Sequence, residues 1–435
     1  MVSEKADHST ATPLDPLEVL GNIDAWNLRR EGEWLRFTGR LDPGLGPRDY
    51  LRDPAGGDVI AVAPGPLYGL LSIGGARRAG FNTGPAAFPH HIFAPGDHIG
   101  AVGLEGSARA EPTGALQKLP HCSQDALIAQ SLLSWRAEGL AALPLFFTRT
   151  ETDGSPTAAA LSEGLAFDNL FAAVDSLCLA AQKLGKEPKV LAVGIDFGAE
   201  DTTSSQAEIE SGLTALMTKI EAGLHRRGLQ RPIFLLACES GHAGAANHPA
   251  ILAHSRLSWL KVGHTIAISA PGYAFDKDRF GRPTDDARLR MAKMDAHAIV
   301  ALTAREDWAC PCPLLAEYDD KDVRVTFSAM EPLVIDPALT DDPSAGFAIV
   351  GSKKPLEIVS VRVDPKDPRT ILLRTKTTIK GEKPTLRYAL PGLADDGASR
   401  RGAIRDSWSA DSVGSDVPLH RWALPAELPM NEAPR

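Results

Sequence analysis

Four acidic side chains follow predicted strands and are the residues best suited to chemistry. Asp196 ends the apolar run VLAVGID, Glu200 and Asp201 follow it in an acidic loop, and Asp278 lies in a later loop. If the strands are parallel, these carboxylates converge at the carboxyl edge of one sheet. Two carboxylates at such an edge could supply the acid and the base that cleave a glycosidic bond. The simpler interpretation is a cluster of loop acids that pairs with Arg282.

The cysteines and histidines form no recognisable metal-binding pattern. The five cysteines lie mostly in apolar runs, which is typical of buried free thiols in a reducing compartment. The CPC at residues 310–312 lacks further ligands at the spacing of a zinc site. His90, His91 and His98 lie in a stretch rich in Gly and Pro, and we interpret them as turn residues rather than as ligands or a base. We therefore expect no metal and no cofactor.

Alternating strand-like and helix-like segments must position these residues. The strand-like runs are apolar and β-branched, and they lie at 58–63, 143–150, 190–196, 232–238 and 265–269. The helix-like runs have apolar residues on one stripe, and they lie at 123–140, 166–184, around 209–224, around 251–260 and at 285–302. The segment PGPLYGLLSIGG after residue 63 is predicted as a tight turn and then a helix or loop, and 80–120 as a long ordered loop. This order predicts a three-layer αβα sandwich, flavodoxin-like, around a parallel sheet.

The pattern of polar and apolar residues divides the 435 residues into three parts. Residues 1–50 are predicted as a polar leader with a short strand, and residues 51–320 as the α/β domain. In residues 321–435 apolar and polar side chains alternate over short segments, which predicts a β-rich C-terminal domain. This length exceeds one ordinary core, so more than one domain is expected.

Charge and hydropathy argue against two classes of partner. The net charge of −9 and a pI near 5.8 disfavour nucleic acid, because binding to phosphates needs clustered Lys and Arg. The sequence contains no run of eighteen apolar residues, so no membrane span is expected. The first sixteen residues lack the apolar segment of a signal peptide. We therefore expect synthesis in the cytoplasm without export by the general secretory route.

The order of elements and several short motifs resemble the SGNH hydrolases, most closely their sialate O-acetylesterase-like branch. Gly198 and Asp201 match the family's middle block, and the Pro-Thr at 283–284 matches the block before its last helix. RGAIRDS at 401–407 and LHRWALP at 419–425 are similar to the ending of phage-associated members. The resemblance extends over most of the chain, from the first apolar strand to near its end.

The same resemblance puts unsuitable residues at the catalytic positions. Pro66 aligns with the nucleophilic serine, but proline has neither a hydroxyl group nor a backbone N–H. Phe197 aligns with a glutamine that donates to the oxyanion. Arg282 takes the place of the histidine, and its guanidinium cannot accept a proton from serine. Asp278 is offset by one from the orienting carboxylate, and Gly154 remains as a match to the oxyanion-hole glycine.

The resemblance therefore implies a catalytically inactive SGNH-like protein, not an enzyme, that binds carbohydrate. The expected ligand-binding residues are those of the carboxyl edge: Gly154, Asp196, Glu200, Asp201, Asp278 and Arg282. Arg282 would suit a carboxylate or an anionic sugar. Similar proteins decorate phage and gene-transfer particles, which implies bacterial surface or capsular polysaccharide as partner, other particle proteins as neighbours, and a place on a virion or phage-like particle.

Two alternatives stay open. The first is an active carbohydrate O-acetylesterase that uses unrecognised residues, with Ser72 or a histidine of the 90–98 group as candidates. The second is a purely structural coat or assembly protein of a particle.

Overall fold

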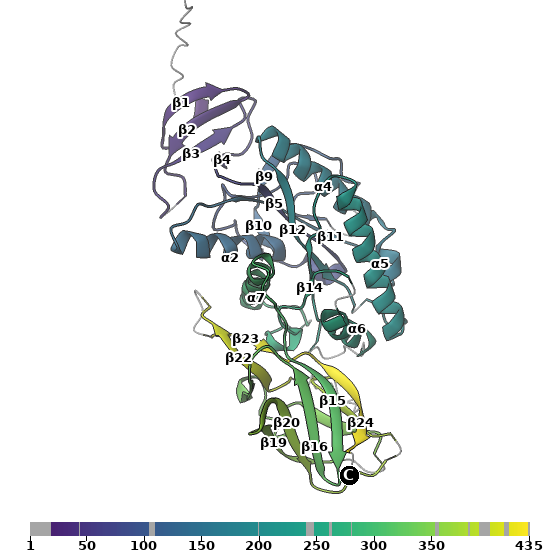
Figure 1. The fold of residues 1–435 in the computed structure, drawn as a ribbon. Helices are drawn as coiled ribbons and strands as arrows, with labels where there is room; N and C mark the ends of the chain where they lie inside the picture. The colour runs from purple at the N-terminus through teal and green to yellow at the C-terminus, as the bar shows by residue number, and fades with distance from the viewer. Residues whose placement is uncertain are drawn as a thin grey trace, which may run out of the picture.

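The computed structural model shows three regions arranged end to end: a small N-terminal sheet, a central α/β region and a C-terminal region of strands (Figure 1). The described residues are 19–42, 44–103, 109–198, 200–240, 248–260, 263–279, 281–352, 356–381, 383–390, 401–412 and 417–433.

The N-terminal region is an antiparallel sheet of four strands in sequence order. Its strands are β1 (Ala25–Glu31), β2 (Trp34–Gly39), β3 (Arg48–Arg52) and β4 (Ile60–Ala61). The prediction of a parallel strand at 58–63 is wrong, because β4 pairs antiparallel with β3. A short apolar run fits any strand that is covered on both sides, so its composition could not identify the sheet to which it belongs.

The central region is built on a mostly parallel sheet in the order β14-β13-β12-β5-β11-β7-β9, with β8 beside β11 and with β9 antiparallel to β7. The strands are β5 (Leu67–Gly74), β7 (Ile92–Pro95), β8 (Val102–Gly103), β9 (Leu116–Lys118), β11 (Leu145–Thr152), β12 (Pro188–Asp196), β13 (Ile233–Leu236) and β14 (Ile266–Ala267). A separate pair joins β6 (Phe81–Thr83) to β10 (His121–Ser123). The stretch 80–120, predicted as a loop, thus adds short strands to the sheet.

The central strand of this sheet was missed by the sequence analysis. Residues 67–74, predicted as a turn followed by a helix or loop, form β5, which pairs with β11 on one side and β12 on the other. Most of β5 is buried, so its residues do not alternate between apolar and polar, and its two glycines weaken the strand pattern.

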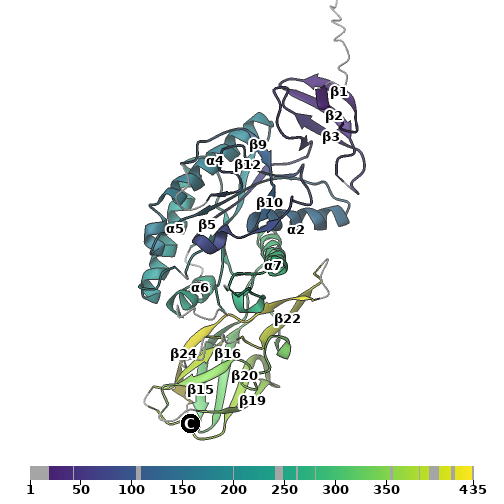
Figure 2. The same ribbon diagram turned by 180° about the vertical axis from the view of Figure 1, so that it is seen from behind.

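Helices cover both faces of the sheet (Figures 1 and 2). One face packs against α2 (Gln124–Glu138) and α7 (Asp285–Thr303), which also contact each other. The other face is covered by α4 (Leu165–Lys183), α5 (Gln206–His225) and α6 (His248–Leu260), whose buried side chains share one cluster with the sheet, and the short α3 (Ala158–Leu161) packs against α5. The predicted helices and the predicted strands from residue 143 to 269 are confirmed, with their ends shifted by a few residues.

One helical stretch among the described residues, Ala158–Lys183, is long and apolar enough to cross a membrane by length and composition. Half of that stretch is buried within the fold, and α4 packs its apolar side against β5 and β11. A core helix meets the same criteria of length and composition, so this stretch is weak evidence for a membrane span.

The C-terminal region consists of strands, as predicted. A seven-stranded sheet has the order β18-β21-β24-β15-β16-β20-β19, and a three-stranded sheet has the order β17-β22-β23. The strands are β15 (Cys312–Asp319), β16 (Asp322–Ser328), β17 (Leu333–Ile335), β18 (Phe347–Val350), β19 (Ile358–Asp364), β20 (Asp367–Thr375), β21 (Thr385–Tyr388), β22 (Ile404–Ala410), β23 (Leu419–Trp422) and β24 (Ala426–Glu432). The proposed boundaries after residues 50 and 320 fall within β3 and between β15 and β16; the division into three domains stays a prediction.

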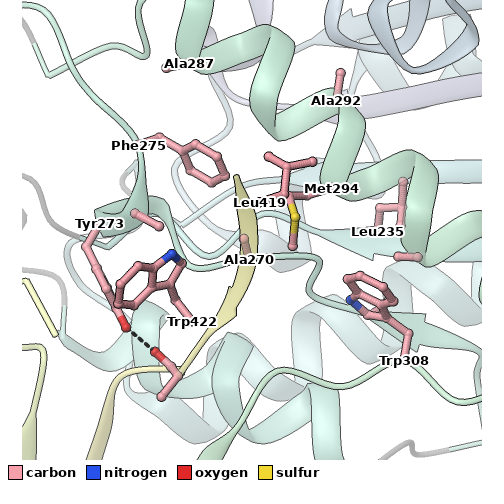
Figure 3. Close-up of a cluster of buried hydrophobic side chains, with 14 of the residues drawn as sticks. Leu235, Ala270, Tyr273, Phe275, Ala287, Ala292, Met294, Trp308, Leu419 and Trp422 are labelled. Carbon is pink, nitrogen blue, oxygen red and sulfur yellow. Dashed lines mark hydrogen bonds between the residues drawn. The ribbon is translucent and has the colours of Figure 1, made fainter. Parts of the chain in front are cut away.

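The motifs at 401–407 and 419–425 lie where the C-terminal strands meet the central region. The hydroxyl group of Tyr273 donates to the backbone oxygen of Ala423 at 2.5 Å. Apolar side chains from both regions, including Met294 and Trp422, share one buried cluster (Figure 3). These motifs therefore join the two regions of the fold.

Candidate functional site

A pocket of about 90 Å³ lies at the carboxyl edge of the central sheet, between the ends of β12 and β13, the segment after β14, and helix α7. Lys277, Gly281, Arg282 and Pro283, from the segment before α7, also line it. A cavity needs roughly 10–15 Å³ by the same measure to hold one water molecule, so this space admits several waters or a small group of a ligand. Carboxyl edges of parallel sheets are the usual place for ligand sites.

A buried arginine, Arg78, lies at the inner side of this pocket, and only 7% of its surface is exposed. Its Nη2 donates to Ser72 Oγ at 2.8 Å and to Asp125 Oδ1 at 2.9 Å. The Ser72 hydroxyl group lies 2.5 Å from both oxygens of Asp125, and the Thr150 hydroxyl group donates to Asp125 Oδ2 at 2.6 Å. The guanidinium group is thereby bonded to the carboxylate of Asp125 and the hydroxyl group of Ser72, and Thr150 of the adjacent strand bonds the same carboxylate.

The pairing of the strands explains why a guanidinium group fits here. Ser72 of β5 lies between Thr150 of β11 and Gly194 of β12 in one row across the sheet. A Cβ atom added at Gly194 would lie 2.7 Å from Arg78 Nη2 and 3.0 Å from Ser72 Oγ. The glycine thus leaves the space that the arginine occupies.

We expect Gly194→Ala to lower the free energy of unfolding by about 1–2 kcal/mol, because overpacking a filled interior forces strained side chains. Urea unfolding monitored by circular dichroism measures this loss. Gly114→Ala is the matched control, since its added Cβ atom would meet no atom closer than 3.5 Å. Equal effects of the two substitutions would contradict the tight fit at Gly194.

Two charged groups of the pocket have shifted pKa values. Burial disfavours the charged form of Arg78, but the carboxylates of Asp125, Asp196 and Asp295 outweigh it and raise the pKa of Arg78. Burial raises the pKa of Asp295 to about 6, although Ser269 and the charge of Arg78 act in the opposite direction. The Ser269 hydroxyl group donates to Asp295 Oδ1 at 2.6 Å. The pocket therefore holds a cation that stays charged and a carboxyl group whose pKa is about 6.

The structure brings some of the predicted binding residues together. Asp196 and Arg282 both line the pocket. Arg282 is 57% exposed at the rim, and its Nε lies 3.5 Å from Asp278 Oδ2, as expected for an ion-paired loop. Glu200 packs against the turn after β5, since a Cβ atom added at Gly75 would lie 2.1 Å from its Oε1.

Asp201 and Gly154 are not part of the described lining of the pocket. Asp201 is buried, and its Oδ1 accepts the backbone N–H groups of Thr203 and Ser204 at 3.4 and 3.0 Å, which shapes the turn into α5. Gly154 lies in the exposed loop after β11.

The position assigned to Pro66 requires a correction. Pro66 directly precedes β5, at the amino end of the sheet, whereas Arg282 lies at the carboxyl edge, so the two residues are not brought together. The turn that follows this first parallel strand consists of residues 75–78, which include no serine, threonine or cysteine. Phe197 is fully buried in the core, and its backbone oxygen accepts from His254 Nε2 at 2.9 Å. Its side chain therefore offers no hydrogen bond to a ligand.

The alternative nucleophile and base candidates lie elsewhere. Ser72 is fully buried and bonded to Asp125. His90 and His91 are buried at the amino end of β7, where each Nδ1 lies 3.1 Å from a backbone oxygen, that of Val59 and that of Pro144 respectively. These contacts fit structural roles for the three side chains.

The cysteines are free and mostly buried, as predicted. Burial raises the pKa of Cys312 and that of Cys238, which lines the pocket, to about 12 in each case. These thiols are therefore neutral and poor nucleophiles. Within the described ranges no three His, Cys, Asp or Glu side chains are grouped to hold a metal ion.

Sequence reasoning missed Arg78, Ser269 and Asp295. The signal for Asp295 was present, because it lies between Met294 and Ala296 in the predicted helix at 285–302, and acidic residues are rarely fully buried. The signal for Arg78 depended on recognising β5, since the arginine follows that strand by only four residues.

Comparisons with known proteins bear on the fold. No family model and no curated protein matches this sequence. A solved carbohydrate acetylesterase from Xanthomonas citri is similar in structure. The alignment covers 90% of this chain and 86% of the esterase chain, at 13% identity and a TM-score of 0.52. This chain is similar in fold to that esterase.

A carbohydrate acetylesterase from Sinorhizobium meliloti and an aryl esterase from M. smegmatis also match. Each alignment covers 54% of this chain and 99% of the esterase chain at 13% identity, and the TM-scores are 0.32 and 0.33 respectively. At these TM-scores the two matches carry no argument, and the Xanthomonas citri structure, at 13% identity, bears on the fold alone. Function must therefore be argued from the site.

Proposed function

We propose that the protein is a catalytically inactive SGNH-like chain of three-layer αβα architecture that binds bacterial surface or capsular polysaccharide. The observation that carries this proposal is the pocket at the carboxyl edge, lined by Arg78, Asp196 and Arg282, next to a turn at 75–78 without a nucleophile. Guanidinium and carboxylate groups suit sugar hydroxyl groups, which both accept and donate hydrogen bonds. Arg282, in the loop before the last helix, cannot serve as a general base.

The proposed biological setting is a spike or fibre of a phage-like particle. Its support is the likeness of RGAIRDS and LHRWALP to the ending of phage-associated members of the family. In such a particle the C-terminal strands would contact other structural proteins while the pocket engages the glycan. This part of the proposal rests on analogy between families.

The test combines binding and turnover. The purified protein is applied to an array of bacterial polysaccharides and to intact encapsulated cells, and is incubated separately with an aryl acetate and with acetylated capsule. We expect saturable glycan binding with no acetate release above that of buffer. The absence of binding to every glycan and cell type would overturn the proposal, as would acetate release at enzyme-like rates.

The second candidate is an active carbohydrate O-acetylesterase, and one specific contact favours it. Ser269 lines the pocket and donates to Asp295 at 2.6 Å, so a hydroxyl group and a carboxyl group of raised pKa are adjacent. Acetate release that disappears in Ser269→Ala would support this function over the first.

A further inference from the structure

One wall of the pocket is formed by residues 270–277, which follow β14 and are called the wall segment here. Its lining residues are Ala270, Gly272, Phe275 and Lys277. The segment contains a short turn of 3-10 helix, and the backbone N–H of Gly272 donates to the backbone oxygen of Cys238, just after β13, at 2.8 Å. Because the wall segment has left the regular strands of the sheet, its position also depends on contacts made by its side chains.

Tyr273, in the middle of the wall segment, connects it to the C-terminal strands. Its side chain is buried, and its hydroxyl group donates to the backbone oxygen of Ala423, just after β23, at 2.5 Å (Figure 3). The same hydroxyl oxygen lies 3.3 Å from that of Tyr388, the last residue of β21. The Tyr388 oxygen in turn accepts from the backbone N–H of Ile404, the first residue of β22, at 3.0 Å. One side chain of the wall segment is thus linked to β21, β22 and the end of β23.

The RGAIRDS motif is closely fitted to this contact. A Cβ atom added at Gly402 would collide with the hydroxyl group of Tyr388 and would lie 3.0 Å from that of Tyr273. The glycine therefore leaves the space in which the two hydroxyl groups meet. Beside it, Arg401 Nη2 lies 3.5 Å from Asp276 Oδ1 of the wall segment, an exposed ion pair that contributes little. Burial raises the pKa of Tyr273 well above its ordinary value, so its hydroxyl group stays a donor at physiological pH.

We propose that Tyr273 is a positioning residue that fixes the wall segment to the C-terminal strands, so that the position of those strands sets the shape of the pocket. The C-terminal region is then part of the binding apparatus as well as an attachment to other proteins. A partner that displaces β21, β22 or β23 would loosen one wall of the pocket through this chain of contacts. The identity of the ligand as a glycan rests on the proposed function, whereas the link between the wall segment and the strands does not.

The experiment measures hydrogen–deuterium exchange of the full chain by mass spectrometry in the wild type and in Tyr273→Phe. Phenylalanine keeps the ring in the buried cluster and removes only the hydroxyl group that donates to Ala423. We expect exchange in peptides of the wall segment to become about fivefold faster, since a hydrogen bond contributes about 1 kcal/mol net and 1.4 kcal/mol equals tenfold. Peptides of β5 and α4 should exchange as in the wild type, because the opening is local.

The matched control is Tyr50→Phe, which removes the hydroxyl group of another buried tyrosine, one that donates to Asp42 Oδ2 at 3.0 Å in the N-terminal region. It should change exchange of the wall segment by less than about twofold. Unchanged exchange of this segment in Tyr273→Phe, or an equal rise in Tyr50→Phe, would overturn this inference.

A second measurement separates this inference from the proposed function. The polysaccharide that the wild type binds most tightly on the array is added, and it should slow exchange of the wall segment in the wild type. If no polysaccharide binds, or if a bound one leaves this exchange unchanged, the proposed glycan site in this pocket fails. The exchange of the free protein in Tyr273→Phe and Tyr50→Phe still decides whether the C-terminal strands hold the wall segment.

Discussion

Arg78→Leu is expected to lower the free energy of unfolding by about 3–5 kcal/mol, which is the largest effect we expect from a single substitution in the central region. The substitution removes a buried cation and leaves the buried Asp125 with the hydroxyl groups of Ser72 and Thr150 as its side-chain partners among the described residues. Removing one partner of a buried ion pair costs more than the pair contributes, because the remaining charge stays away from water. Urea unfolding of the full chain at pH 7 measures the loss.

A second substitution tests this cause. Asp125→Asn in the Arg78→Leu background removes the isolated charge while an amide oxygen still accepts from Ser72, so the double variant should regain about 2 kcal/mol. Arg282→Leu is the matched control, because Arg282 is 57% exposed and its exposed ion pair should contribute less than about 1 kcal/mol. A cost for Arg78→Leu no greater than that of Arg282→Leu would show that the network does not stabilise the fold.

The elements that the sequence predicted well are those with a clear period. The helices predicted at 166–184 and around 209–224 each bury one stripe of side chains, and that stripe can be recognised from residue spacing alone. β5 has no such period, because it is central and buried on both faces. Missing this strand moved the expected nucleophile position to Pro66, at the wrong end of the sheet.

The candidate site was predictable only in part, for a similar reason. Asp196 was identified because it ends a recognisable strand, and strand ends meet at one edge. Arg78 bonds Ser72 of β5 and Asp125 of α2, and Asp125 in turn accepts from Thr150 of β11. These residues are far apart in sequence, so only the folded chain brings them together. A buried network of this kind depends on the register between strands, which short motifs do not specify.

The titration of Asp295 leads to the second large effect, a dependence of stability on pH. Its pKa rises from an ordinary value of 3.8 to about 6 in the folded chain. Between these values the folded chain keeps a proton that the unfolded chain releases, so the contribution of Asp295 to stability falls as pH rises from about 4 to 6. Above about pH 6 the carboxyl group is ionised in both states, and the cost of burying its charge is complete. A shift of two pKa units corresponds to a loss of roughly 2–3 kcal/mol in the free energy of unfolding.

Asp295→Asn should therefore stabilise the protein by about 2–3 kcal/mol at pH 8 and by much less at pH 4, because asparagine is neutral at both and its amide oxygen can still accept from Ser269. Unfolding free energies of variant and wild type across this range give the difference, in which other titrating groups cancel. Asp286→Asn, an exposed position on the same helix, should show no such dependence on pH. An equal effect of Asp295→Asn at both pH values would mean that the folded chain holds this carboxyl group ionised throughout, with Arg78 outweighing its burial.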